Sequence, residues 1–217
     1  CSSLSSISWP TSLEEISEST FYGCSSLTSF HIPDGVTGIK SDAFSGCSSL
    51  TGINIPDSVT YLGDGAFGDC SSLTNISIPA GITEIENHTF SGCSSLTSIS
   101  IPAGVTSIEK QTFDGCSSLT SISIPDSVTN ISSYAFSGCS SLKDVYYAGS
   151  QEQWSKIEIA DLKNESLFSA TIHYNSSGPD AGTVTKSAQS VTASDITKTY
   201  GAKAFSLGAK ASGGTAL

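Results

Sequence analysis

Residues 93–115 have the sequence CSSLTSISIPAGVTSIEKQTFDG, and the chain repeats this pattern with a period of 23 residues. The tetrapeptide Cys-Ser-Ser-Leu opens every repeat, and its cysteines are Cys1, Cys24, Cys47, Cys70, Cys93, Cys116 and Cys139. A fixed period of this size is typical of a solenoid, in which each repeat forms one coil and buries its apolar face against neighbouring coils. The repeat therefore predicts a binding surface rather than a catalytic centre.

The part of each repeat between its leucine and its proline has the pattern of a half-buried strand. In residues 96–102, Ile99 and Ile101 alternate with serines, and β-branched residues favour strands. Pro102 ends the strand because it has no N–H for pairing, and the Pro-Ala-Gly, Pro-Asp-Gly and Pro-Asp-Ser triplets predict turns. Later columns of Val or Ile, then Ile, then Phe return the chain to the core. The glycine before most of the cysteines predicts a backbone position with positive φ.

The columns that share this register resemble the BspA-like class of leucine-rich repeats. The shared pattern is Cys-Ser-Ser-Leu-x-x-Ile-x-Ile-Pro-x-x-Val-Thr-x-Ile-x-x-x-Ala-Phe-x-Gly, and we expect six whole repeats and one partial repeat over residues 1–149. The resemblance implies a β-rich, right-handed leucine-rich-repeat solenoid with a parallel sheet on one face. It also implies a secreted or surface-anchored protein of the kind often described as an adhesin, commonly from bacteria that live on a host.

The seven cysteines are interpreted as small buried hydrophobic residues. Neighbouring coils lie roughly 4.8 Å apart, but equivalent side chains on stacked coils point in parallel, and an odd number of cysteines cannot pair completely within one chain. Zinc sites usually use close pairs such as Cys-x-x-Cys, and the sequence has none. We therefore expect buried thiols, no metal site and no cofactor. The serine pair after each cysteine is expected to hydrogen-bond turn backbone.

The distribution of charge excludes several classes of partner. The sequence lacks arginine, and residues 1–138 hold thirteen acidic residues and two lysines, a net charge of −11. A surface with so few cations does not hold a phosphate backbone or an anionic membrane, so we expect no nucleic-acid partner. No Asp-x-Asp-x-Asp calcium loop occurs, and no apolar run approaches the roughly 18 residues of a membrane span.

The three histidines give no indication of an enzyme. His31 falls on a strand, His88 on a back loop and His173 in the C-terminal part, and their spacing supports no Cys–His or Ser–His–Asp grouping. A chain without arginine and without a clustered His/Asp/Glu set lacks most of the usual catalytic groups. We therefore predict that the protein is not an enzyme.

The repeat pattern ends where the last coil needs a cap over its open core. We expect this cap over residues 150–174 and expect short helices in it, because Ser150 and Gln153 fit a helix capping box. Asn164 could begin a further turn. Trp154 is interpreted either as a plug over the core or as a carbohydrate platform.

The sequence changes character again after the cap. Residues 175–186 are small and polar with Gly and Pro, which is the composition of a linker. Residues 187–217 resemble the opening of a bacterial immunoglobulin-like module. Such a β-sandwich needs roughly 100 residues, so this one is truncated.

The outward positions of the sheet are the expected binding face. They lie four, five and seven residues after each cysteine and are small and hydroxylated until the last coil. Protein hot spots favour Trp, Tyr and Arg, which this face mostly lacks. The candidate binding residues on it are His31, Asn54, Asn75, Ser100, Ser123 and Tyr146.

The leading interpretation is a non-catalytic extracellular protein that binds host or neighbouring-cell surface proteins through this face. Two alternatives stay open: a carbohydrate-binding module that uses Tyr146 and Trp154, and an architectural stalk that displays other domains. The N-terminal coil is a candidate surface for self-association, because its apolar residues have no preceding coil to cover them. We expect a cell-surface location, with targeting and anchoring segments outside residues 1–217.

Overall fold

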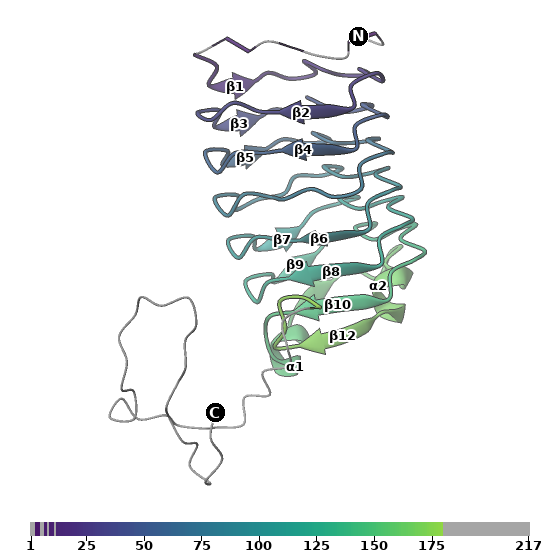
Figure 1. Ribbon diagram of the computed structural model, residues 1–217. Coiled ribbons are helices and arrows are strands. Elements are labelled where there is room, and N and C mark those ends of the chain that lie inside the picture. Colours follow the sequence, from purple (N-terminus) through teal and green to yellow (C-terminus); the bar gives the residue numbers. More distant parts are fainter. Residues whose placement is uncertain (1–2, 5–6, 8, 11, 180–217) are drawn as a thin grey trace, which may run out of the picture. The chain divides into compact units, whose positions relative to one another are not determined.

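The computed structural model describes residues 3–4, 7, 9–10 and 12–179 of the chain (Figure 1). Most of the expected linker and all of the expected immunoglobulin-like module, residues 187–217, lie outside the described residues. The described residues belong to one compact unit that ends at Gly182.

This unit is a β-solenoid, as the repeat predicts. We call the strands that follow each Cys-Ser-Ser-Leu motif, together with the last strand of the cap, the front strands: β2 (Ser29–His31), β4 (Gly52–Asn54), β6 (Ser98–Ser100), β8 (Ser121–Ile124), β10 (Asp144–Tyr147) and β12 (Thr171–Tyr174). They form two parallel sheets, β2-β4 and β6-β8-β10-β12. Each residue of a front strand pairs with the equivalent residue of the next coil, so that Ile99 lies beside Ile122 and Ile122 beside Val145.

A second set of shorter strands follows the turn after each proline. These second strands are β1 (Glu15–Ile16), β3 (Gly38–Ile39), β5 (Tyr61–Leu62), β7 (Ser107–Ile108), β9 (Asn130–Ile131) and β11 (Glu158–Ile159). They pair in parallel as β1-β3-β5 and β7-β9-β11. Coils that form both strands therefore contribute a front strand and a second strand to neighbouring sheets (Figure 1).

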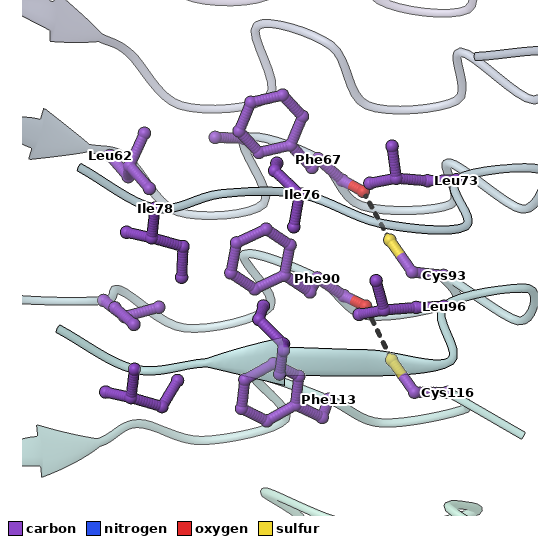
Figure 2. Packing of buried hydrophobic residues seen from close by; sticks show 14 of the residues in the cluster. Leu62, Phe67, Leu73, Ile76, Ile78, Phe90, Cys93, Leu96, Phe113 and Cys116 are labelled. Carbon is purple, nitrogen blue, oxygen red and sulfur yellow. Dashed lines mark hydrogen bonds between the residues drawn. The ribbon is translucent and has the colours of Figure 1, made fainter. Parts of the chain in front are cut away.

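Each apolar column of the sequence becomes a continuous stack in the core. The phenylalanine rings stack face to face, with centroid distances of 5.1 Å between Phe21 and Phe44 and 5.7 Å between Phe90 and Phe113. Figure 2 shows this stack beside the cysteine column, where the thiols of Cys93 and Cys116 donate to phenylalanine carbonyls. The six cysteines from Cys24 to Cys139 are free and buried, which confirms their interpretation as core residues.

The turn before each cysteine has the backbone conformation that the glycine column predicts. Gly46 and Gly92 have φ of 74° and 72°, and Asp69 keeps φ at 53° although it lacks the freedom of glycine. A Cβ on Gly92 would lie 2.2 Å from Asp69 Oδ1. Glycine is therefore required there by close approach as well as by conformation.

The fourth coil, residues 70–92, departs from the prediction. The sequence predicts a strand from Leu73 to Pro79, but no strand forms there, and the main chain of residues 75–78 makes no backbone hydrogen bond to the described residues of either neighbouring coil. The second strand is missing from the same coil. The phenylalanine rings are also farther apart here than in the pairs above: the ring centroids of Phe67 and Phe90 lie 5.9 Å apart.

Like charges meet beside the missing second strand of this coil. Glu86 stands one repeat from Glu109, so their carboxylates occupy equivalent positions on neighbouring coils, and like charges opposite each other are destabilising. Burial together with Glu84, Glu109 and Asp64 raises the pKa of Glu86. The solenoid therefore has a weak seam at its fourth coil.

The cap contains the short helices that the sequence predicts. Helix α1 (Gln151–Trp154) begins with the expected capping box between Ser150 and Gln153. Helix α2 (Glu165–Ser169) follows, with its N-cap residue Asn164 fully buried. Strand β12 then pairs with β10 and extends the front sheet past the last repeat (Figure 1).

Candidate functional site

The threonine hydroxyls at the start of the front strands are engaged in holding the coils together. The Oγ1 atoms of Thr51, Thr74, Thr97 and Thr120 each donate to the carbonyl of the threonine one coil earlier, over 3.0–3.3 Å. The first serine after four of the cysteines does the same: Ser71, Ser94, Ser117 and Ser140 each donate to the serine carbonyl one coil earlier. These hydroxyls are structural, which confirms the expectation for the first serine of these pairs and removes the threonine row as a set of free ligand donors.

The front face of the early coils carries polar residues without a convergent site. His31 and Asn54 are exposed and touch each other, with 3.3 Å between Asn54 Nδ2 and His31 Nδ1. Asn75 is exposed on the unpaired fourth coil and donates to Thr74 Oγ1. Ser100 is exposed and lines a shallow groove of about 310 Å³ at the seam. The structure therefore does not gather these four candidates into one site.

Three side chains converge at the C-terminal end of the front sheet. The Tyr146 cluster consists of Asp144 and Tyr146 on β10 and His173 on β12. The Tyr146 and His173 rings stack with centroids 4.8 Å apart and planes 16° from parallel. His173 Nε2 lies 2.7 Å from Asp144 Oδ1, and both side chains are 39 % exposed. The cluster is rigid and accessible, which is what a binding anchor requires.

His173 belongs to this cluster although its spacing in the sequence gives no such grouping. Strand β12 pairs with β10 so that His173 lies beside Tyr146. On the other side Tyr146 lies beside Ser123. One face of the phenol ring is therefore stacked on His173, and the other lies on the side of Ser123. The cluster could have been identified from the sequence if residues 170–174 had been aligned as the next front strand.

Trp154 is separated from the Tyr146 cluster by the sheet. Tyr147 is buried beneath the sheet, and Trp154 packs against it edge to face with centroids 5.1 Å apart. Neighbouring residues of a strand point to opposite faces. Trp154 therefore helps to close the core, and the structure does not bring it together with Tyr146 as a shared platform.

The chain after β12 turns back and passes close to Ser123. A Cβ placed on Gly178 would lie 3.7 Å from Ser123 Oγ, and the Ser176 N–H donates to the Tyr147 carbonyl. Ser123 is only partly exposed as a result. Among the candidate binding residues, Tyr146 is the one that gains neighbours with complementary chemistry.

The described residues offer no arrangement for metal or thiol chemistry. Within them, no group of three or more His, Cys, Asp or Glu side chains is placed to hold a metal ion. Burial raises the pKa of the Cys47 thiol to about 11 and that of the Cys139 thiol to about 12. No helix of the described part of the chain is long and apolar enough to cross a membrane.

Comparison with known proteins places the fold. The chain is 45 % identical to a leucine rich cell surface protein of Faecalibacterium prausnitzii, over 60 % of this chain and 34 % of that one, with a TM-score of 0.59. A leucine-rich repeat protein of Bacteroides ovatus is 26 % identical over 81 % of this chain and 56 % of that one, with a TM-score of 0.55. A similar protein of Eubacterium ventriosum is 29 % identical, with coverages of 58 % and 35 % and a TM-score of 0.54.

This chain spans less than two thirds of the length of each of these structures. No curated protein matches the sequence. The family model described as BspA type leucine rich repeat region, with six copies, matches residues 1–94 and 64–177. These matches cover most of the chain and agree with the 23-residue coils, so the protein belongs to the BspA-type leucine-rich repeat family.

Proposed function

We propose that this chain is a non-catalytic, extracellular binding module that attaches to a protein partner at the C-terminal end of its front sheet. The observation that carries the proposal is the Tyr146 cluster. It is the place on the described front face where an aromatic ring, a carboxylate and an imidazole are held together by direct contacts. Binding energy at protein interfaces is concentrated in a few such residues, with tyrosine among the most frequent.

The rest of the front face supports this role as a scaffold. Its threonine hydroxyls hold the main chain of neighbouring coils, and its remaining outward side chains are mostly small. Small, energetically neutral residues around an anchor exclude water without adding much affinity. An extracellular location is part of the proposal and is supported by the family and by the cell surface protein from Faecalibacterium prausnitzii.

The test is binding of residues 1–217 to an array of host extracellular-matrix proteins. We expect saturable binding to one or more of them. The double variant Tyr146→Ser/His173→Ser should abolish this binding, because it removes both rings of the cluster; serine is the residue that pairs with Tyr146 on the preceding coil. The matched control is His31→Ser/Asn54→Ser, which removes the contact pair of the early coils and should bind normally. Equal binding by all variants would overturn the assignment to this end of the sheet.

A glycan partner is a second candidate, favoured by the face of the Tyr146 ring that lies opposite His173. Aromatic rings flanked by polar side chains suit the stacking of a sugar ring. Isothermal titration with host oligosaccharides separates the two candidates, because only glycan binding predicts saturable heat that Tyr146→Ser removes. If neither proteins nor glycans bind, the architectural stalk is favoured.

A further inference from the structure

We infer that the Tyr146 cluster receives a lysine or arginine side chain from a basic segment of the protein partner. This inference rests on the proposed function and names the chemistry of its partner. Three observations support it: the net charge of the chain, the geometry of the cluster, and a second place in the solenoid where a carboxylate and a phenol ring contact a lysine.

The described part of the chain is strongly acidic, and most of its negative charge lies in residues 1–138. Residues 1–179 contain eighteen acidic residues, five lysines and no arginine, a net charge of −13. A potential of this sign attracts basic partners and repels acidic ones. Charge complementarity therefore selects a partner surface rich in lysine or arginine.

The cluster presents the two groups that bind such a side chain. Asp144 uses Oδ1 for His173, and its Oδ2 has no hydrogen-bond partner among the described residues. Tyr146 is partly exposed, and the face of its ring opposite His173 lies on the side of Ser123. A cation over a tyrosine ring is stabilised by the electrons of the ring face. Asp144 and Tyr146 are two residues apart on one strand, so both point outward from the same face.

The solenoid contains an internal example of the same chemical groups. Lys40 Nζ lies 2.9 Å from Glu15 Oε1 and 5.0 Å from the centroid of the Tyr61 ring. These three residues come from three successive coils, whereas Asp144 and Tyr146 lie on one strand, so the two places share the groups and not their geometry. In the Tyr146 cluster the carboxylate and the phenol are present, and the lysine or arginine comes from the partner.

Lys143 sets a limit on the strength of this contact. It precedes Asp144, is exposed, and forms no ion pair among the described residues. Its ammonium group repels a partner cation at close range. The equivalent residue of the preceding coil is Thr120. Lys143→Thr should therefore strengthen the binding of a basic partner, whereas substitution of Asp144 or Tyr146 should weaken it.

The experiment measures binding of the full chain to a fluorescent Gly-Ser peptide that carries several arginines, beside the same peptide with glutamine in their place. We expect the arginine peptide alone to bind. Asp144→Ser and Tyr146→Ser should each weaken it about 3-fold to 10-fold, the size expected of an exposed ion pair or cation–π contact. Asp126→Ser removes the same charge from an exposed turn and should change binding less than about 2-fold, as surface charges far from a contact do.

Two results overturn the inference. Equal binding of the arginine and glutamine peptides shows that no cation is recognised. Equal losses in Asp144→Ser and Asp126→Ser show general charge attraction without a site. Circular dichroism of each variant confirms that it is folded. If binding of a matrix protein from the array depends on Tyr146 while the arginine and glutamine peptides bind equally, the proposed function stands and only a basic partner is excluded.

Discussion

The main-chain N–H of Phe136 donates to the side-chain Oδ1 of Asn164 over 3.0 Å. In the preceding coils this N–H donates to the main chain of the next coil, as Phe113 does to the Ala135 carbonyl. The partial repeat after Phe136 has no phenylalanine turn to accept this N–H, and the Asn164 amide oxygen accepts it instead. The Asn164 Nδ2 group also donates to the carbonyls of Ser132 and Ala160. One buried side chain therefore satisfies the open end of the phenylalanine turn.

Asn164→Ala should destabilise the protein by about 3 kcal/mol. The substitution leaves the Phe136 N–H and the Ala160 carbonyl without these partners, while the Ser132 carbonyl keeps the Ala135 N–H, and each unpaired buried group costs about 1–3 kcal/mol unless water reaches it. Urea unfolding followed by circular dichroism measures the change.

The matched control for this prediction is Asn75→Ala. Asn75 is exposed and bonds only to a neighbouring hydroxyl, so its loss should change the free energy of unfolding by less than about 0.5 kcal/mol. Equal effects of the two substitutions would contradict the role of Asn164 as a substitute for the missing phenylalanine turn.

The sequence predicted those features that recur in every coil. The buried cysteine and phenylalanine columns and the positive φ before the cysteines are confirmed, and the strand alternation is confirmed outside the fourth coil. Periodicity reveals them because each repeat supplies an independent copy of the same physical requirement.

The features that occur once were not predictable in the same way. The contact between Asn164 and Phe136 joins the cap to the last repeat, and the Tyr146–His173 stack depends on the register between β10 and β12. The like charges of Glu86 and Glu109, beside the missing second strand of the fourth coil, also meet only when coils are stacked. Pairings of this kind need the three-dimensional register, which a single sequence does not supply.

The buried thiols should make the fold sensitive to alkali. Burial raises the pKa of the Cys47 thiol to about 11, and it also raises the pKa of the Cys93 thiol well above its usual range. An unfolded thiol ionises near pH 8.5, so above that pH the unfolded chain releases protons that the folded chain keeps. The free energy of unfolding should therefore fall as pH rises, by up to about 1.4 kcal/mol per pH unit for each thiol.

This slope is measured by urea unfolding under reducing conditions between about pH 8 and pH 10, a range that includes the pKa of an unfolded thiol. Cys93→Ala is the appropriate comparison, because it keeps every lysine and tyrosine and removes one buried thiol. Its stability should fall less steeply with pH than that of the unmodified protein. Parallel slopes would mean that the thiols do not govern alkaline stability.

Glu86→Gln should tighten the seam at the fourth coil. Removing one of the neighbouring like charges should raise the free energy of unfolding at pH 7 by about 0.5 kcal/mol. The pKa of Glu86 is raised in the folded state by burial and by Glu84, Glu109 and Asp64. The folded state therefore holds this proton more tightly than the unfolded state, and Glu86 lowers stability as pH rises from the usual carboxyl range through the raised pKa.

The thermal midpoint of the unmodified protein should consequently fall more between mildly acidic and neutral pH than that of Glu86→Gln. Asp126→Asn serves as the control because it removes an equal charge from an exposed turn. If Asp126→Asn flattens the pH dependence as much as Glu86→Gln does, overall charge rather than the contact at the seam is responsible.

Trp154→Ala should weaken the fold and leave binding at the Tyr146 cluster intact. Trp154 packs on the buried Tyr147 ring, so its removal exposes the end of the core and should cost about 2–3 kcal/mol, less than a fully buried tryptophan. Phe168→Ala, which removes an aromatic ring of the same cap that is 52 % exposed, should cost less than 1 kcal/mol, as surface substitutions roughly do. Binding of the array partner, measured well below the thermal midpoint, should be unchanged in both variants, because Trp154 and Tyr146 lie on opposite faces of β10. Loss of binding in a folded Trp154→Ala protein would instead place the recognition site on the cap.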